Sequence, residues 1–221
     1  SEGLFQRSIP EIENTDLFKL SPFKVLTHEQ AIAVEQIVEA LLQDLAAGTR
    51  STSVIQGNPG TGKTIVAIFL MKLLGDIRDY DDADEVEQDS LFAEFFVPEN
   101  RELLRGVRIG LVVPQQSLRD SIKKVFRKTP KVSEDLVLNP FDVGKSTVPF
   151  DLLIVDETHR LNRRANQSSG IRNRDFAEIN ARLFVWDDTT KTQLDWIRAQ
   201  SRHQILLIDE RQGVRPADLP S

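Results

Sequence analysis

Apolar residues follow two different periods along the chain. Between Thr27 and Gly48 they recur every three or four positions, which is typical of an amphipathic helix. Thr27 is a natural N-cap for this helix and Gly48 a natural C-terminal stop. The apolar positions are Ile32, Val34, Ile37, Val38, Leu41, Leu42 and Leu45.

Short apolar runs then alternate with helical patterns. The runs lie at 53–57, 107–113, 151–157 and 204–209, and the helical patterns at 63–74, 115–126 and 189–200. Such runs with helices between them predict an α/β fold, in which a parallel sheet is covered by helices on both faces. We expect two less regular stretches: 129–150, and an arginine-bearing polar loop at 162–174.

A phosphate-binding motif follows the first run. The residues predicted to cradle a nucleotide are Gly57, Asn58, Pro59, Gly60, Thr61, Gly62, Lys63 and Thr64. They match the pattern G-x-x-x-x-G-K-[ST], with a strand before it and a helix after it. Phosphates would lie at the helix N-terminus. Lys63 would reach the β- and γ-phosphates and Thr64 would hold Mg²⁺.

A pair of acids supplies the second half of this site. Asp156 and Glu157 end the third apolar run, about 90 residues after the phosphate loop. We expect Asp156 to lie beside the loop and to hold Mg²⁺ opposite Thr64. Glu157 would polarise the attacking water, because phosphoryl transfer depends on positioning and charge stabilisation.

Charge is unevenly distributed. The net charge is −6, whereas residues 76–102 carry eleven acidic and two basic residues, so the rest of the chain has a net charge of +3. A mildly basic body is compatible with nucleic acid. We interpret 76–106 as an acidic insertion, most simply a solvated segment.

Composition excludes several classes of protein. The absence of cysteine excludes disulfides and thiolate zinc sites. The longest apolar run, "IVAIFLM", is far too short to span a membrane. We therefore expect a cytoplasmic protein without a membrane partner.

The motifs resemble those of a helicase family. "GNPGTGKT" and "VDETHR" resemble motifs I and II of superfamily 1 helicases, "LTHEQ" their upstream glutamine motif, and "ILLIDERQGVRP" motif III. "VVPQQSLRDSIKKVF" occupies the place of motif Ia. The signatures are most similar to those of the bacterial helicase-like domain related to the Schlafen helicase region. This resemblance implies a RecA-like P-loop NTPase that uses ATP and Mg²⁺.

The resemblance also implies an organisation. Residues 1–26 would be an N-terminal extension, and 27–221 the first RecA-like domain. Motifs IV to VI are not visible, so we expect a monomeric fragment, half of a motor whose second RecA-like domain belongs to the same full-length protein. Thr158 departs from the alanine that is common after the two acids.

Further roles are implied by the resemblance, each beside a simpler alternative. Gln30 would read adenine, or it would form a capping box with Thr27. Gln212 would sense the γ-phosphate, or it is an ordinary loop residue. His159 would couple the nucleotide state to motif III, or it is a hydrogen-bonded loop histidine.

Single-stranded DNA or RNA is the expected partner. The residues that would contact it are Gln115, Ser117, Arg119, Arg163 and Arg164, of which the loop arginines are equally explained as solvated side chains. We interpret the chain as an ATP-hydrolysing helicase or translocase domain. The alternatives are a nucleotide-gated interaction module without unwinding activity and an AAA-type ring ATPase.

Overall fold

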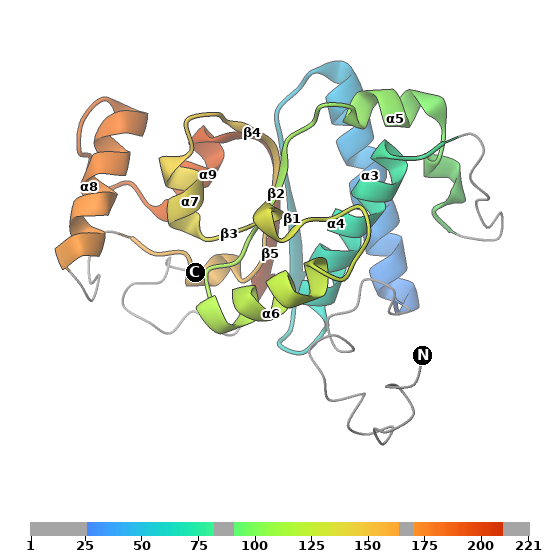
Figure 1. Ribbon diagram of the computed structural model, residues 1–221, viewed down its shortest axis with the longest axis horizontal. Coiled ribbons are helices and arrows are strands. Elements are labelled where there is room, and N and C mark those ends of the chain that lie inside the picture. The colour runs from blue at the N-terminus through green and yellow to red at the C-terminus, as the bar shows by residue number, and fades with distance from the viewer. Residues whose placement is uncertain (1–25, 82–90, 164–169, 210–221) are drawn as a thin grey trace.

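The described residues of the computed structural model, 26–81, 91–163 and 170–209, contain one five-stranded parallel sheet (Figure 1). The strands are β1 (Ser51–Gly57), β2 (Ile109–Val112), β3 (Val137–Leu138), β4 (Phe150–Val155) and β5 (Ser201–Asp209). Their order across the sheet is β1-β5-β4-β2-β3. The predicted α/β fold class, a RecA-like P-loop NTPase with a parallel sheet, is confirmed.

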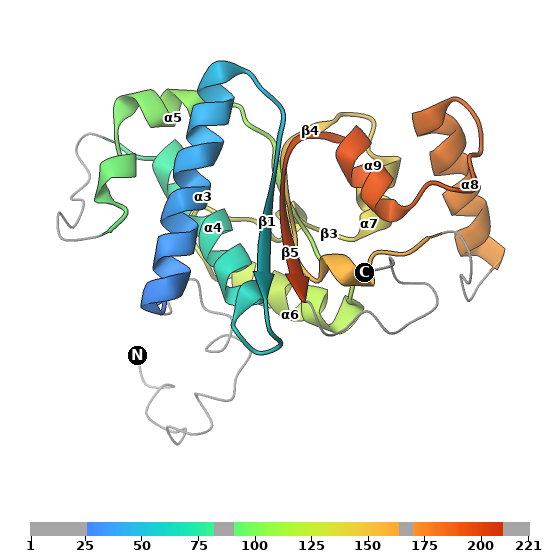
Figure 2. The ribbon, with the colours of Figure 1, turned by 180° about the vertical axis from the view of Figure 1, so that it is seen from behind.

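Helices cover both faces of the sheet (Figures 1 and 2). On one face lie α3 (His28–Ala47), α4 (Lys63–Arg78) and α6 (Gln116–Phe126), with α5 (Pro98–Leu104) packed against α3 and α4. On the other face lie α7 (Pro140–Lys145) and α9 (Gln193–Ala199). α8 (Gly170–Phe184) packs against α7 and α9 and lies outside them (Figure 2).

The hydrophobic core follows these layers. The largest cluster joins the buried faces of α3, α4 and α6 to β2, β4 and β5. α4 is its centre, with Ile68, Leu70 and Leu74 fully buried. Each such side chain stabilises the fold by roughly 1.5–3 kcal/mol. This packing fixes α4, and with it the phosphate loop at its N-terminus.

The strand order determines which residues lie together at the carboxyl ends of the strands. All strands are parallel, so their carboxyl ends lie together. Gly57 at the end of β1 pairs with Asp209 at the end of β5, and Val155 at the end of β4 pairs with Leu206. β5 therefore lies between the strand of the phosphate loop and the strand of the predicted acids, which are not direct neighbours.

Several sequence predictions are confirmed in this architecture. Thr27 and Gly48 cap α3, and Gly48 adopts a left-handed conformation with φ of 66°. The four predicted strands correspond to β1, β2, β4 and β5.

Three sequence predictions are wrong. The segment 76–106 is not simply solvated, because it holds the end of α4, the short 3₁₀ helix η1 (Ala93–Phe95) and α5, and because Phe95 and Leu104 are buried in the core.

The stretch 129–150 is more regular than expected, since it contains β3 and α7. The expected loop 162–174 is also partly helical, because α8 begins at Gly170 and carries Arg172 and Arg174. The helix is held by Phe176 and Ile179, which are buried with Trp196 of α9.

Some predictions fall on residues that the structure does not describe. These include most of the N-terminal extension (1–25), the most acidic part of the insertion (82–90), Arg164 and Gln212. Within the described ranges, no helix has both the length and the apolarity that a membrane span requires.

Candidate functional site

The phosphate loop turns directly into α4. Gly62 is the N-cap residue of α4 and has φ of 81°, a left-handed conformation that L side chains rarely adopt. A Cβ at Gly62 would also lie 2.6 Å from Nε2 of Gln30. The left-handed conformation favours glycine here, whereas the Gln30 amide lies at the end of a flexible side chain that can move aside. The loop therefore presents backbone N–H groups at the N-terminus of a long, buried helix, where an anion is stabilised.

Lys63 is held inside its own loop. Its Nζ donates to the carbonyl oxygens of Gly57 at 2.9 Å and Asn58 at 2.8 Å, and lies 3.9 Å from Oδ2 of Asp209. Only 11% of the side chain is exposed. The ammonium group thus lies within the loop hollow, where phosphate oxygens can replace the two carbonyl oxygens as its partners.

The shortest link between the two predicted motifs joins Thr64 and Asp156. Oγ1 of Thr64 donates to Oδ2 of Asp156 at 2.6 Å, across 92 residues of sequence. A hydroxyl and a carboxylate oxygen are hard ligands of the kind that Mg²⁺ prefers. Among the described residues no group of three or more acidic or histidine side chains is placed to hold a metal. A Mg²⁺ held here would need substrate phosphates and water as further ligands, which is its usual mode of binding.

Burial makes Asp156 electrostatically unusual. Its exposed fraction is 1%, and desolvation by this burial raises its pKa from 3.8 to about 6. This value of about 6 already includes the other effects on the pKa: the hydrogen bond from Thr64 lowers it, repulsion from Glu157 raises it, and the Glu157 backbone hydrogen bond and the charge of Lys63 lower it. The site therefore contains a buried carboxylate with too little positive charge around it, as expected for a cation ligand.

Glu157 stands next to Asp156 in a left-handed conformation, with φ of 51°. Such a conformation costs a non-glycine residue of the order of 1–3 kcal/mol and is often found at functional sites. The Glu157 carboxylate forms an ion pair with Nε of Arg160, from the short 3₁₀ helix η3 (Thr158–Arg160). Arg160 therefore orients the carboxylate predicted to polarise water.

His159 is buried beside Glu157. Only 8% of it is exposed, and Nε2 lies 3.4 Å from Oε2 of Glu157, within ion-pair distance. Among the described residues neither ring nitrogen has a hydrogen-bond partner. Both predicted roles of this histidine, coupling to motif III and a hydrogen-bonded loop residue, stay predictions.

Gln30 links α3 to the phosphate loop. Its Oε1 accepts from the Thr27 backbone N–H at 3.0 Å, and Oγ1 of Thr27 accepts from the Gln30 N–H at 3.3 Å, which completes the capping box. Its Nε2 also donates to the Thr61 carbonyl at 2.7 Å. The capping alternative is therefore observed. The same side chain lies at the phosphate loop, where the predicted adenine contact would form.

The predicted nucleic-acid residues that the structure describes, Gln115, Ser117, Arg119 and Arg163, lie along the same edge of the sheet. Gln115 and Ser117 follow β2 and hydrogen-bond to each other at 3.1 Å, whereas Nη1 of Arg119 donates to the Val113 carbonyl at 2.8 Å. Arg163 pairs with Thr192 in an isolated antiparallel bridge. A polar cleft of about 270 Å³ lies nearby, lined by Pro114, Gln116, Arg119, Asn139, Pro140, Phe141, Asn162, Arg172, Asp175 and Gln193.

Several of these cleft residues carry no motif in the sequence. Asn139 is recognisable only as the N-cap of α7, in the Asn-Pro step that precedes that helix. The contact of Gln193 with Asn162, in which its Oε1 accepts from the Asn162 backbone N–H at 2.9 Å, joins segments 31 residues apart. Outside the cleft, Arg160 ends the VDETHR motif, but no role for it was apparent from the sequence; its ion pair with Glu157 appears only in the structure.

The fold and this edge define a P-loop NTPase. A sequence model of the Schlafen group 3 DNA/RNA helicase domain matches residues 50–220. The chain therefore belongs to the Schlafen group 3 DNA/RNA helicase domain family.

A more distant relative is replication factor C small subunit 2 of Pyrobaculum aerophilum. It is 24% identical over 154 residues, which are 70% of this chain and 37% of the relative. The chain thus spans little more than a third of that relative's length.

The raised pKa of Asp156 generates a stability prediction. Because this pKa is higher in the folded protein than in the unfolded chain, ionised Asp156 destabilises the fold above about pH 6, and the penalty vanishes below about pH 4. Without nucleotide and Mg²⁺, Asp156→Asn should raise the free energy of unfolding at pH 8 by about 2–3 kcal/mol. Urea unfolding at pH 4 and pH 8 measures this difference.

Asp120→Asn is the matched control, since it makes the same charge change at an exposed position of α6. It should alter stability little at either pH. An Asp156→Asn protein that is less stable than wild type at pH 8 would contradict the assigned burial cost.

Proposed function

We propose that the chain is the ATP-binding and ATP-hydrolysing motor domain of a superfamily 1-type helicase or translocase that acts on single-stranded DNA or RNA. One observation carries the proposal: the hydroxyl of Thr64 meets the carboxylate of Asp156 at 2.6 Å, with Glu157 directly beside them. Membership of the Schlafen group 3 DNA/RNA helicase domain family supports it independently.

Each residue has a defined task in this proposal. The N–H groups of the phosphate loop and Nζ of Lys63 bind the phosphates, and Lys63 exchanges two carbonyl partners for phosphate oxygens. Thr64 and Asp156 hold Mg²⁺, which neutralises phosphate charge when bound. Glu157 polarises the attacking water and accepts its proton, while Arg160 fixes the direction of that carboxylate.

His159 would report the state of the nucleotide. Its Nε2 lies 3.4 Å from Oε2 of Glu157, and η3 packs against β5, which contains the start of the predicted motif III. A change in the partners of Glu157 during hydrolysis would therefore change the contacts of His159. Gln212 would receive this signal in the proposed scheme.

Nucleic acid would bind along the edge that holds the β2–α6 connection. The cleft there presents amide and guanidinium groups from Gln116, Asn162 and Arg119. Such groups contact phosphates and sugars of a strand. Gln115, Ser117, Arg163 and Arg164 extend this contact in the proposal. The common edge would couple strand binding to the nucleotide site.

A second RecA-like domain is part of the proposed motor. Asn58, Pro59 and Gly60 at the tip of the phosphate loop are exposed, so the γ-phosphate side of the site is open to a closing domain. Cationic side chains from such a domain typically contribute about 10³-fold or more to phosphoryl transfer. In this organisation, residues 27–221 form the first domain and 76–106 an acidic insertion within it.

The relationship to replication factor C small subunit 2 supports a second candidate. That relative is named as a subunit, and a ring ATPase would complete its site with a residue from a neighbouring copy. Sedimentation of the protein with ATP and Mg²⁺ separates the two candidates: the helicase proposal expects a monomer, and the ring proposal an oligomer.

Lys63→Ala tests the phosphate-loop assignment. Loss of charged hydrogen bonds worth about 1.5–3 kcal/mol should weaken ATP binding by roughly 10- to 100-fold. The fold should remain, because Lys63 contacts the loop and not the hydrophobic core. Titration calorimetry with ATP and Mg²⁺ provides the affinity. Exposed Lys124→Ala on α6 is the control and should bind as wild type does, whereas unchanged affinity in Lys63→Ala would refute the assignment.

Glu157→Gln tests the catalytic role. The amide has the same shape as the carboxylate but cannot accept a proton, so hydrolysis should slow by about 100-fold or more while ATP still binds. Single-turnover hydrolysis with and without a single-stranded oligonucleotide measures the step. Wild-type turnover in this variant would move the catalytic role to another residue.

A further inference from the structure

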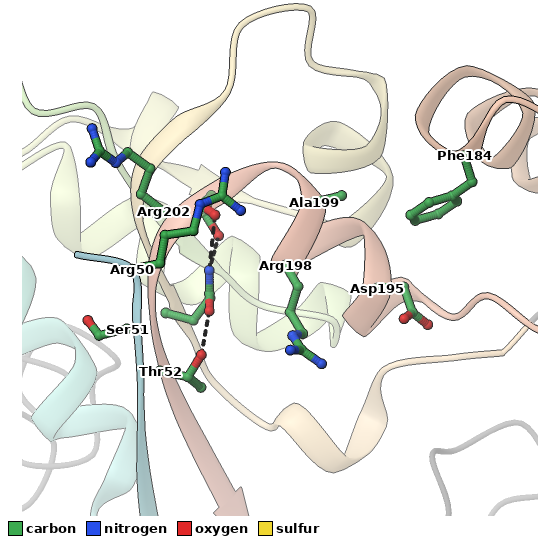
Figure 3. A pocket seen from close by; sticks show the side chains of 10 residues that line it. Arg50, Ser51, Thr52, Phe184, Asp195, Arg198, Ala199 and Arg202 are labelled. Carbon is green, nitrogen blue, oxygen red and sulfur yellow. Dashed lines mark hydrogen bonds between the residues drawn. The ribbon is translucent and has the colours of Figure 1, made fainter. Parts of the chain in front are cut away.

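A second cleft lies at the opposite edge of the sheet, where β1 and β5 begin. Its volume is about 430 Å³. The residues that shape it are Arg50, Thr52, Phe184, Arg198, Arg202 and Gln204. They come from the start of β1, the end of α8, the last turn of α9 and the start of β5 (Figure 3).

This cleft is separate from the proposed ATP site. β1 has seven residues, and a strand rises by about 3.3 Å per residue, so its two ends are roughly 20 Å apart. The phosphate loop follows the last residue of β1, whereas Arg50 precedes the first. A ligand in the cleft would not touch Lys63.

The floor of the cleft is a fixed chain of hydrogen bonds. Oγ1 of Thr52 donates to Oε1 of Gln204 at 2.6 Å, and Nε2 of Gln204 donates to Oγ of Ser201 at 2.9 Å. Oγ of Ser201 in turn donates to the Ile197 carbonyl at 2.6 Å. Gln204 and Ser201 are buried. The polar side chains of the floor therefore hydrogen-bond within the protein and hold one another in place. The guanidinium groups around the floor take no part in this chain and remain available to bind a ligand.

The walls of the cleft are cationic. Among the described residues, neither Arg50 nor Arg198 forms an ion pair, and both are exposed. Asp195 is the single carboxylate of the lining, and its Oδ2 already accepts from the N–H and Oγ1 of Thr192, each at 2.8 Å. Three arginines and one acid leave a net charge of +2 in the cleft.

The two unpaired arginines flank the floor. Figure 3 shows Arg50 extending from the β1 side toward the Ser201 end of the hydrogen-bond chain and Arg198 extending from α9 toward the Thr52 end, whereas Arg202 points away. This agrees with the hydrogen bond from Nη2 of Arg202 to the Gly48 carbonyl at 3.0 Å. The helix dipole favours a cation in the last turn of α9, which explains why an arginine is stable at position 198. No helix end explains the arginine at position 50.

We propose that this cleft binds a phosphate group between the guanidinium groups of Arg50 and Arg198. The planar guanidinium fork matches phosphate oxygens in a bidentate arrangement. The exposed position of both arginines lets them close on such a group from two sides. The phosphate belongs either to the backbone of a nucleic-acid strand or to a free phosphate compound, and the two sources share the same contacts.

The test uses the 221-residue chain with Lys63→Ala, so that the phosphate loop contributes little anion binding. Pyrophosphate is titrated by calorimetry into this protein and into the same protein carrying Arg50→Gln and Arg198→Gln. Arg50→Gln together with Arg198→Gln should weaken pyrophosphate binding at least tenfold. Because the titration does not depend on ATP, its failure would be distinct from failure of the proposed motor function.

The matched control carries Arg105→Gln and Arg127→Gln in place of the cleft changes. These arginines are exposed, with 78% and 60% of their side chains accessible, and each forms a surface pair outside the cleft. The net charge changes equally in the two double variants. The control should retain pyrophosphate binding, so equal weakening in both would overturn the proposal, as would absence of pyrophosphate binding before any cleft change.

An oligothymidylate identifies the source of the phosphate. A strand that binds in the cleft should compete with pyrophosphate. The logarithm of its affinity falls linearly with the logarithm of the salt concentration, and each lost phosphate contact lowers the steepness of this line by about one. The line should therefore be less steep by about two for the cleft variant than for the control. Competition with this change in slope assigns a strand backbone. Pyrophosphate binding without competition assigns a free phosphate compound.

A more conservative double variant provides a test even if the glutamine variant does not fold. Arg50→Lys with Arg198→Lys keeps the charge but removes the bidentate fork. It should bind pyrophosphate more weakly than the parent and more tightly than a folded glutamine variant. If the glutamine variant fails to fold, unchanged affinity in the lysine variant would overturn the proposal.

Discussion

The hydrogen bond between Thr64 and Asp156 is the contact on which the proposed motor site depends. It joins the first turn of α4 to the end of β4, although β5 lies between the two strands in the sheet. The contact forms only if β1, β5 and β4 are all parallel, because only then do their carboxyl ends share one edge. The buried face of α4 and the strand ladders on both sides of β5 therefore hold a site that no single segment could form.

Several features of the same site destabilise the folded protein, and the packing of the rest of the chain offsets their cost. Burial raises the pKa of Asp156 to about 6, and Glu157 occupies a left-handed conformation beside it. Among the described residues, the two buried ring nitrogens of His159 have no hydrogen-bond partner. Natural proteins violate local rules of this kind mainly at functional sites. In the proposed motor site, a bound cation would lower the cost of burying the Asp156 carboxylate.

The sequence predicted the elements whose signals are local and strong. The capped helix α3, the phosphate loop with α4, and the apolar runs of β2 and β4 follow from periodicity and motif alone. β3 has two residues and α7 six, too few to establish a period. α8 is stabilised by the packing of Phe176 and Ile179 against Trp196, a partner that the sequence around α8 does not reveal. The position of β5 between β1 and β4, and the presence of Arg50 and Arg198 in one cleft, depend on strand order, which local patterns do not encode.

The central claim is that Thr64 and Asp156 act together on one Mg²⁺ that accompanies ATP. The most direct measurement is a double-mutant cycle on ATP affinity, with Mg²⁺ and with a chelator, for wild type, Thr64→Ala, Asp156→Asn and the double variant. With Mg²⁺, each single change should weaken binding and the double change should cost little more than the larger single one, because both disrupt one interaction. With the chelator, the four proteins should bind ATP nearly alike. Fully additive losses, or identical losses with and without Mg²⁺, would contradict the claim.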